Sequence, residues 1–341
     1  MRSNRFDFLR LVFATAVFVY HLVVLAALDV NGVWEPRLAE FAELSIQGFF
    51  VISGALVYGS WERSRSIEDY VGKRFRRLYP AYAVIILVPA SVSLLLGGAI
   101  EGVASYASAN LLFANFLVPT LPGLFENQRF DAVNGALWTL KIEVMFYIAL
   151  IVLGPLIVWL KRRRAPMLWA FFLVVYAGGE AWRWGFEAMA VEEARPVWAQ
   201  LARQLPGQMA FFMSGIGLWI WRDWILARLS SVWRLGLLLL AISIIVPGGD
   251  VVRALGLAAL IAGAAWGRGP KLRAAKYGDI SYGLYICHFP IVQALVAGGV
   301  FAVSPWLGTV ASIVLVLIAS FALWHFVERP ALRPDSHYRR G

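Results

Sequence analysis

Eleven apolar segments dominate the chain, and most of them are long enough to cross a bilayer as helices. Hydrocarbon offers no hydrogen-bond partner to the backbone, so each crossing segment must satisfy its own polar groups, as a helix does. The chain is 60% hydrophobic and 15% charged, and no polar stretch is long enough for a separate soluble domain. We therefore predict an all-α, polytopic integral membrane protein in which residues 1–341 form a single transmembrane domain. The apolar segments are 8–28, 44–60, 78–99, 103–119, 136–159, 167–184, 203–221, 232–247, 251–267, 280–300 and 304–327.

The segment at 103–119 is the most polar of this set, with two serines and two asparagines. Counting it as a span would place the basic run at 161–164 outside, against the bias of Lys and Arg towards cytoplasmic loops. We therefore predict about ten transmembrane helices, with 103–119 re-entrant or lying on the surface, and both termini cytoplasmic. Basic groups at 63–77, 161–164 and 268–276 then all lie inside. The outside segment at about 100–135 is expected to form an irregular cap.

Charge and cysteine content exclude several classes of function. The net charge of +10 follows from the basic cytoplasmic loops, so we expect a lipid bilayer as partner and no nucleic acid. The single Cys287 excludes an intramolecular disulfide and a cysteine metal cluster. Four scattered histidines do not have the spacing of a zinc site, so we expect no metal and no permanently bound cofactor.

The first apolar segment carries ionisable residues, which are costly inside a membrane and functional by default. Arg10 and His21 are eleven residues apart, so they lie within about 20° of each other around a helix. His21 and Glu143 are each seven residues from the outer end of their segments, roughly 10 Å below the outer surface. A carboxylate at the level of an imidazole can orient it as a general base. The alternative is that each residue satisfies a local hydrogen bond between helices.

A basic cluster, Lys73-Arg74-Phe75-Arg76-Arg77, precedes the third apolar segment on the predicted cytoplasmic side. Four cations in five residues suit a ligand with several phosphates, such as coenzyme A. The alternative is a cluster that stops translocation or contacts lipid headgroups.

The ninth predicted span opens with Ser281 and carries Tyr282, Tyr285 and His288 at intervals of three, on one helical face. Counting from the inner surface places His288 about 12 Å deep, nearer Arg10 than His21. Pro290 is expected to open the helix locally and to free backbone carbonyls toward a cavity. An isolated histidine flanked by aromatic residues is also typical of simple packing.

Two further motifs have structural interpretations. Gly48, Ser53 and Gly54 in the second span predict close packing of helices. Glu328-Arg329-Pro330 at the inner end of the last span predicts a local ion pair.

Taken together and in order, these segments resemble the acyltransferase-3 family of polytopic membrane O-acyltransferases, in the stand-alone form without a fused extracytoplasmic domain. The resemblance covers nearly the whole chain. Its motifs are Arg10-x10-His21, Gly48–Gly54, Arg74-x-x-Arg77 before Tyr79-Pro80, Leu137-Trp138-Thr139-Leu140 through Glu143, Ser281-Tyr282 through His288-Phe289-Pro290, and Glu328-Arg329-Pro330.

The resemblance implies an enzyme of the bacterial inner membrane that takes an acyl group, usually acetyl, from cytoplasmic acyl-CoA. The acceptor would be a hydroxyl of a cell-surface polysaccharide, O-antigen, exopolysaccharide or glycolipid. His21, Glu143 and Arg10 would be catalytic, with His21 acting either as a general base or as the carrier of an acyl-imidazole. The residues expected to bind acyl-CoA are Arg74, Arg76, Arg77, Ser281, Tyr282, Tyr285 and His288.

The chain departs from the family pattern at two positions. Val144 follows Glu143 where a second acid is common, which leaves the local acid–base arrangement open, and Cys287 stands where an aromatic residue is frequent. The opening Phe6-Asp7-Phe8-Leu9-Arg10-Leu11 is similar to the branch linked to exopolysaccharide or O-antigen modification.

Two other classes of function fit a polar membrane interior. A transporter or flippase for a lipid-linked glycan would use it as a pathway, although such proteins often contain paired repeats and we find none here. A purely structural membrane subunit would leave the ionisable residues Arg10, His21 and Glu143 unexplained.

Overall fold

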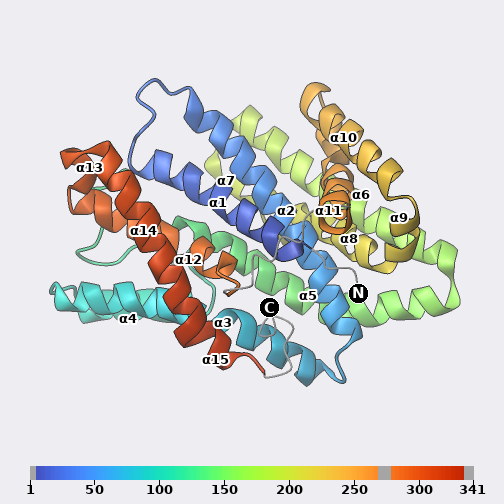
Figure 1. The fold of residues 1–341 in the computed structure, drawn as a ribbon, viewed down its shortest axis with the longest axis horizontal. Helices are drawn as coiled ribbons and strands as arrows, with labels where there is room; N and C mark the ends of the chain where they lie inside the picture. The colour runs from blue at the N-terminus through green and yellow to red at the C-terminus, as the bar shows by residue number, and fades with distance from the viewer. Residues whose placement is uncertain (1–4, 268–277, 334–341) are drawn as a thin grey trace. The chain divides into compact units, whose positions relative to one another are not determined.

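The computed structural model describes residues 5–267 and 278–333 (Figure 1). Residues 1–4, 268–277 and 334–341, which include both chain ends and the predicted basic loop at 268–276, lie outside the described residues. All regular structure within the described ranges is helical, apart from one isolated bridge between Leu121 and Leu124. The predicted all-α class is confirmed.

The helices follow one another along the chain as labelled in Figure 1. Short 3-10 turns precede two of them, and a π-helical turn follows α14. Their bounds are α1 (Phe6–Leu25), α2 (Trp34–Glu62), α3 (Ile67–Leu95), α4 (Ile100–Leu111), η1 (Gly135–Leu137), α5 (Trp138–Arg163), α6 (Ala165–Glu193), α7 (Pro196–Ala202), α8 (Leu205–Ile220), α9 (Arg222–Ala227), α10 (Leu229–Ile245), η2 (Gly249–Val252), α11 (Arg253–Trp266), α12 (Ser281–Ala297), α13 (Val300–Val303), α14 (Pro305–Leu323), η4 (Trp324–Glu328) and α15 (Arg329–Ala331).

Six helical stretches of the described chain are long and apolar enough to cross a membrane. They are Phe6–Leu25, Trp34–Glu62, Ile67–Leu95, Gly135–Arg163, Gly249–Trp266 and Pro305–Ala331, with α10 and α12 as shorter apolar helices. Each of the ten predicted spans overlaps a helix, but the number of ten crossings stays a prediction. The polar segment at 103–119 begins inside α4, a 12-residue helix that is too short to cross a bilayer alone, and continues beyond its end.

Two helices begin well before the apolar segments that predicted them. Helix α2 begins at Trp34 and α3 at Ile67, although the apolar segments begin at 44 and 78. Hydropathy marks only the part of a helix that can contact lipid, whereas the helix itself continues through polar turns. Glu68 and Asp69 in the first turn of α3 favour such an early start, because carboxylates stabilise a helix N-terminus. The basic cluster at 73–77 therefore lies inside α3.

The chain folds into two compact units, each built from three separated stretches. The first unit comprises residues 1–9, 46–70 and 142–272, and the second comprises residues 10–45, 71–141 and 273–341. Nine of the ten predicted site residues belong to the second unit, and Glu143 belongs to the first. The expectation of a single domain stays a prediction.

In the first unit, α2 and α8 approach each other through glycines. A Cβ added to Gly54 would overlap the Phe212 carbonyl oxygen, and one added to Gly215 would overlap the Val51 carbonyl oxygen. Only residues without side chains allow two helix backbones to come this close. The predicted close packing at Gly54 is confirmed.

In the second unit, an irregular stretch at 112–134 follows α4 and is held by side-chain hydrogen bonds. The Gln293 amide donates to the Phe130 carbonyl at 2.6 Å, and the Ser93 hydroxyl donates to the Pro122 carbonyl at 2.6 Å. Arg129 forms an ion pair with Glu35 at 2.9 Å. The predicted irregular cap at 100–135 is thus half correct, because its first part is the helix α4.

Candidate active site

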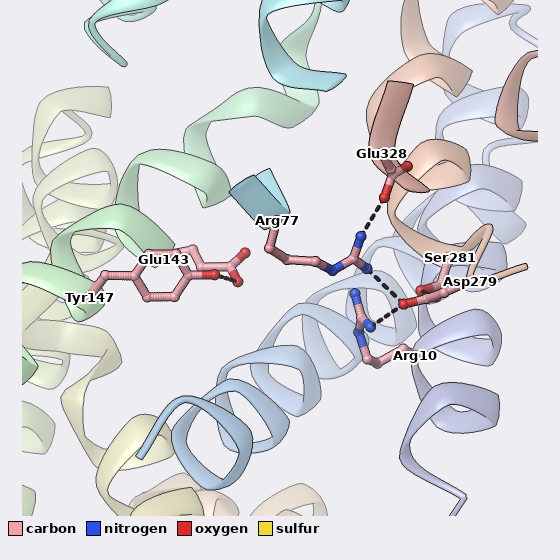
Figure 2. Close-up of polar contacts among 7 residues, drawn as sticks. All are labelled: Arg10, Arg77, Glu143, Tyr147, Asp279, Ser281 and Glu328. Carbon is pink, nitrogen blue, oxygen red and sulfur yellow. Dashed lines mark hydrogen bonds and ion pairs between the residues drawn. The ribbon is translucent and has the colours of Figure 1, made fainter. Parts of the chain in front are cut away.

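A buried ion-pair network joins three helices of the second unit (Figure 2). Arg10, on the second turn of α1, donates to Asp279 Oδ2 at 2.8 Å, and Arg77, on α3, donates to the same oxygen at 2.7 Å. Asp279 lies two residues before α12 and is 3% exposed. One carboxylate oxygen therefore fixes α1, α3 and the start of α12 against each other.

Arg77 has a second carboxylate partner, Glu328, which is 1% exposed (Figure 2). Glu328 ends the π-helical turn η4, in which the Arg329 amide donates to the Trp324 carbonyl five residues back. A π turn inserts one residue into a helix and often marks a functional site. The predicted local ion pair of Glu328 is wrong, because its partner lies 251 residues away in the sequence. Sequence proximity favoured Arg329, whereas the π turn presents Glu328 to α3.

In the contacts drawn in Figure 2, two guanidinium groups face two acidic side chains. Burial alone would raise the pKa of Asp279. The combined effect of Arg10, Arg77 and the Ser281 hydroxyl outweighs burial, so the pKa lies below its ordinary range. Removing one member of such a buried network leaves an uncompensated charge and is strongly destabilising.

Two of the residues predicted to bind acyl-CoA contact this network. Ser281 donates to Asp279 Oδ1 at 2.6 Å, and the Tyr282 hydroxyl donates to the Leu78 carbonyl at 2.9 Å. The Arg77 guanidinium also lies over the Tyr282 ring, 5.4 Å from its centre. Ser281 and Tyr282 therefore help to hold Asp279 and Arg77 in place.

The basic cluster divides between two faces of α3. Arg74 and Arg77 are three residues apart, share one helical face and are both buried. Arg76 lies on another face, is exposed, and donates to the Ala331 carbonyl at 3.4 Å. The cluster is thus not a single row of cations facing one ligand, and the phosphate-binding role of Arg74, Arg76 and Arg77 stays a prediction.

Two imidazoles form the second polar cluster of this unit. His21 Nδ1 lies 2.9 Å from His288 Nε2, and the rings stack with centres 5.0 Å apart. His288 is completely buried and His21 is half-buried. On its other side, His288 Nδ1 lies 3.0 Å from the Leu284 carbonyl oxygen.

The predicted depth of His288, nearer Arg10 than His21, is wrong. The estimate assumed that α1 and the ninth span start at the same inner surface, but Asp279 bonds Arg10, which is already one turn inside α1. His21 lies eleven residues after Arg10, and His288 lies nine residues after Asp279. Because Arg10 and Asp279 are in contact, the two imidazoles lie at nearly the same height.

Other side chains of the second unit fix the part of α12 that carries His288. Tyr285 and Thr139 share a hydrogen bond of 2.7 Å between their hydroxyls. Pro290 has no amide hydrogen, so the Ile286 carbonyl lacks its helical partner, and the Asn134 side chain donates to it at 2.8 Å. The carbonyl that Pro290 leaves without a helical partner thus meets Asn134, and α12 continues through Pro290, so the predicted local opening toward a cavity stays a prediction.

Glu143 lies on α5 in the first unit, where it accepts a hydrogen bond from Tyr147, one turn further on (Figure 2). The pairing of Glu143 with His21 stays a prediction. The polar contacts that the structure describes for His21 are with the His288 imidazole and the Val17 backbone.

Asp279 and Asn134 are not among the site residues predicted from the sequence. Asp279 had a usable signal, because an acid two residues before a helix that begins with Ser281 and Tyr282 is a polar group at a membrane boundary. No sequence signal indicates Asn134, because its role depends on Pro290, which is distant in the sequence.

Comparison with known proteins identifies the family. Residues 3–325 match the family described as "Acyltransferase domain", the acyltransferase-3 family. The chain belongs to this family. The resemblance drawn from the motifs is thereby confirmed, and the two clusters of the second unit lie in a membrane acyltransferase.

Two relatives align with this acyltransferase over nearly their whole lengths. "Nodulation protein 10" of Rhizobium leguminosarum bv. viciae is 27% identical over 97% of this chain and 93% of that protein. "O-acetyl transferase" of Shigella phage Sf6 is 28% identical over 98% of each. No solved structure matches the chain.

Proposed function

We propose that this acyltransferase moves an acetyl group from cytoplasmic acetyl-CoA to a hydroxyl of a cell-surface polysaccharide, O-antigen, exopolysaccharide or glycolipid. Membership of the family and the relative named "O-acetyl transferase" support transfer to oxygen. The apolar helices and the bias of basic residues in the loops support a location in the bacterial inner membrane.

The observation that carries the proposal is the half-buried His21, held against a second imidazole in a member of an acyltransferase family. As a general base, His21 takes the proton of the acceptor hydroxyl while that oxygen attacks the thioester carbonyl. The carbon–sulfur bond then breaks, and the departing thiolate takes the proton from the imidazolium as CoA-SH. The products are the O-acetylated glycan and free CoA.

A two-step version uses the same residue as a nucleophile. Neutral His21 attacks the thioester, CoA leaves as the thiolate, and an acetyl-imidazolium remains. The acceptor hydroxyl then attacks this acetyl group, and its proton passes to the thiolate or to solvent. Glu143 is part of the proposal in both versions, as the carboxylate that acts with His21.

For the donor, we propose that Arg74 and Arg76 hold CoA phosphates, because guanidinium groups form paired hydrogen bonds with phosphate oxygens. Arg10 and Arg77 form the ion-pair network with Asp279 and Glu328, and they maintain the inner end of the path for the acyl arm. Ser281, Tyr282 and Tyr285, all on α12, then lie beside that path.

The test is to compare surface glycans of a deletion strain, its parent and strains complemented with wild-type protein or the His21→Ala variant. We expect the deletion to remove a mass increment of one acetyl group, which wild-type protein restores and His21→Ala does not. Restoration by His21→Ala at normal membrane levels contradicts the proposal. A flippase would instead change the amount of glycan at the surface without changing its acetylation, and it would not release CoA from acetyl-CoA after purification.

A further inference from the structure

The protonation of the imidazole pair follows from its hydrogen-bond partners. A carbonyl oxygen only accepts hydrogen bonds, so the 3.0 Å contact with Leu284 places a proton on His288 Nδ1. Among the described residues, the polar contacts of His288 are with the backbone of Leu284 and Tyr285 and with His21, and none of these is a carboxylate. A completely buried imidazolium without a carboxylate is costly, so His288 is neutral and its Nε2 carries a lone pair.

That lone pair decides the state of His21. The 2.9 Å contact between His288 Nε2 and His21 Nδ1 needs one hydrogen, which His21 must supply. In neutral His21 the proton is then on Nδ1, and Nε2 has the lone pair. Neighbouring aromatic rings restrict the rotation of both imidazoles. The ring centroids of Phe289 and His21 are 5.1 Å apart, and those of Phe18 and His288 are 5.8 Å apart.

We propose that His288 is the positioning residue of His21: it accepts the Nδ1 proton and thereby makes His21 Nε2 the atom that reacts. This assignment rests on the proposed function for its catalytic consequence. His288 then has the orienting role that a carboxylate has in a catalytic triad, although it is neutral. It replaces the acyl-CoA contact expected for His288 from the sequence, and it applies to both the one-step and the two-step mechanism.

The protonation state can be measured without any activity. The chain has four histidines, so the His325→Gln/His337→Gln variant, reconstituted in lipid and labelled with nitrogen-15 in histidine, leaves only the two imidazoles of interest. We expect both to have a protonated Nδ1 and an unprotonated Nε2 near neutral pH. A protonated Nε2 on either ring overturns the proposal.

The catalytic consequence is tested with purified protein, acetyl-CoA and glycolipid extracted from the cell envelope. His288→Phe keeps a flat ring but has no acceptor, so we expect kcat to fall roughly 100-fold while KM for acetyl-CoA stays unchanged. His288→Gln can accept the Nδ1 proton through its amide oxygen and is expected to lose only about tenfold in kcat.

Failure of the inference is distinguishable from failure of the proposed function. Full activity of His288→Phe, with His21→Ala inactive, overturns the role of His288 and leaves the function in place. Full activity of His21→Ala contradicts the proposed function, whereas the labelled spectra still test the protonation of the pair. If His288→Phe does not fold, His288→Gln and the spectra decide. A Glu143→Gln variant that changes the His21 tautomer would assign the orienting role to Glu143 and overturn the proposal.

Discussion

Arg77 donates to Asp279 at 2.7 Å although 202 residues separate them in the sequence, and Arg10 donates to the same carboxylate oxygen. Three helices of the second unit thus meet at one atom. Because α1 and α12 also carry the two imidazoles, the position of this carboxylate fixes the heights of His21 and His288 relative to each other. The ion-pair network and the histidine pair are therefore structurally coupled.

Replacing Asp279 with Asn tests how much the ion-pair network stabilises the fold. The Asn side chain keeps the shape but leaves the buried Arg77 and the part-buried Arg10 facing a neutral acceptor. We expect the free energy of unfolding to fall by about 3 kcal/mol, measured by chemical or thermal unfolding in detergent. Asp223→Asn is the matched control, because its partner Arg222 is 3.4 Å away and its side chain is 89% exposed. The control is expected to change stability by less than about 0.5 kcal/mol, and equal losses in both variants would contradict a stabilising role of the network.

The pH dependence of the same comparison follows from the lowered pKa of Asp279. A carboxyl whose pKa is lower in the folded than in the unfolded state contributes stability above its unfolded pKa, about 3.9, and loses it as the pH falls through the folded value. The contribution of Asp279 to the stability difference between wild type and Asp279→Asn should therefore shrink as the pH falls below about 4. Unfolding midpoints of both proteins between about pH 5 and 2 measure it. A difference that does not change over this acid range would contradict the lowered pKa of Asp279.

Much of this arrangement was predictable from local sequence. The apolar segments predict the helices, and the spacing of Gly48, Ser53 and Gly54 predicts close packing, which depends only on which side chains are small. The spacing of Arg10 and His21 places them on one face of one helix by simple geometry. These properties belong to single segments, so a single sequence contains the information.

The partners of the site residues were not predictable in the same way. From the sequence, Arg77 is predicted to be a cation at the cytoplasmic membrane surface that binds phosphate. Its counter-ions, Asp279 and Glu328, are 202 and 251 residues away in the sequence, so local spacing does not reveal them. His288 was placed at the wrong depth because the start of α12 relative to α1 is set by the Asp279–Arg10 contact, not by hydropathy. Pairing between distant segments depends on the assembled fold, and sequence spacing does not encode it.

Asn134 and Pro290 provide a test of one such long-range contact. The Asn134 amide replaces the backbone donor that Pro290 lacks at the Ile286 carbonyl, at 2.8 Å. Asn134→Ala should therefore lower the free energy of unfolding by about 1–3 kcal/mol, because a buried carbonyl loses its partner. In a Pro290→Ala background the backbone amide of the introduced alanine can donate instead, and the loss should fall below about 1 kcal/mol. Unfolding of the four proteins in this double-mutant cycle measures the coupling, and strictly additive effects would show that Asn134 acts elsewhere.

The division of the basic cluster between two faces of α3 predicts different outcomes for two neighbouring arginines. Arg77 has two carboxylate partners, so Arg77→Gln should destabilise the fold by about 3 kcal/mol. Arg76 is exposed, and Arg76→Gln should leave the unfolding midpoint unchanged while it weakens acetyl-CoA binding about tenfold. Titration calorimetry in detergent measures the affinity, and the exposed Arg228→Gln serves as the control for a lost positive charge.

If Arg76 contacts the 3′-phosphate, the affinity difference between acetyl-CoA and its 3′-dephospho form should disappear in Arg76→Gln. Unchanged acetyl-CoA affinity in Arg76→Gln would exclude this residue from the donor site and limit the phosphate contacts to the buried face that carries Arg74.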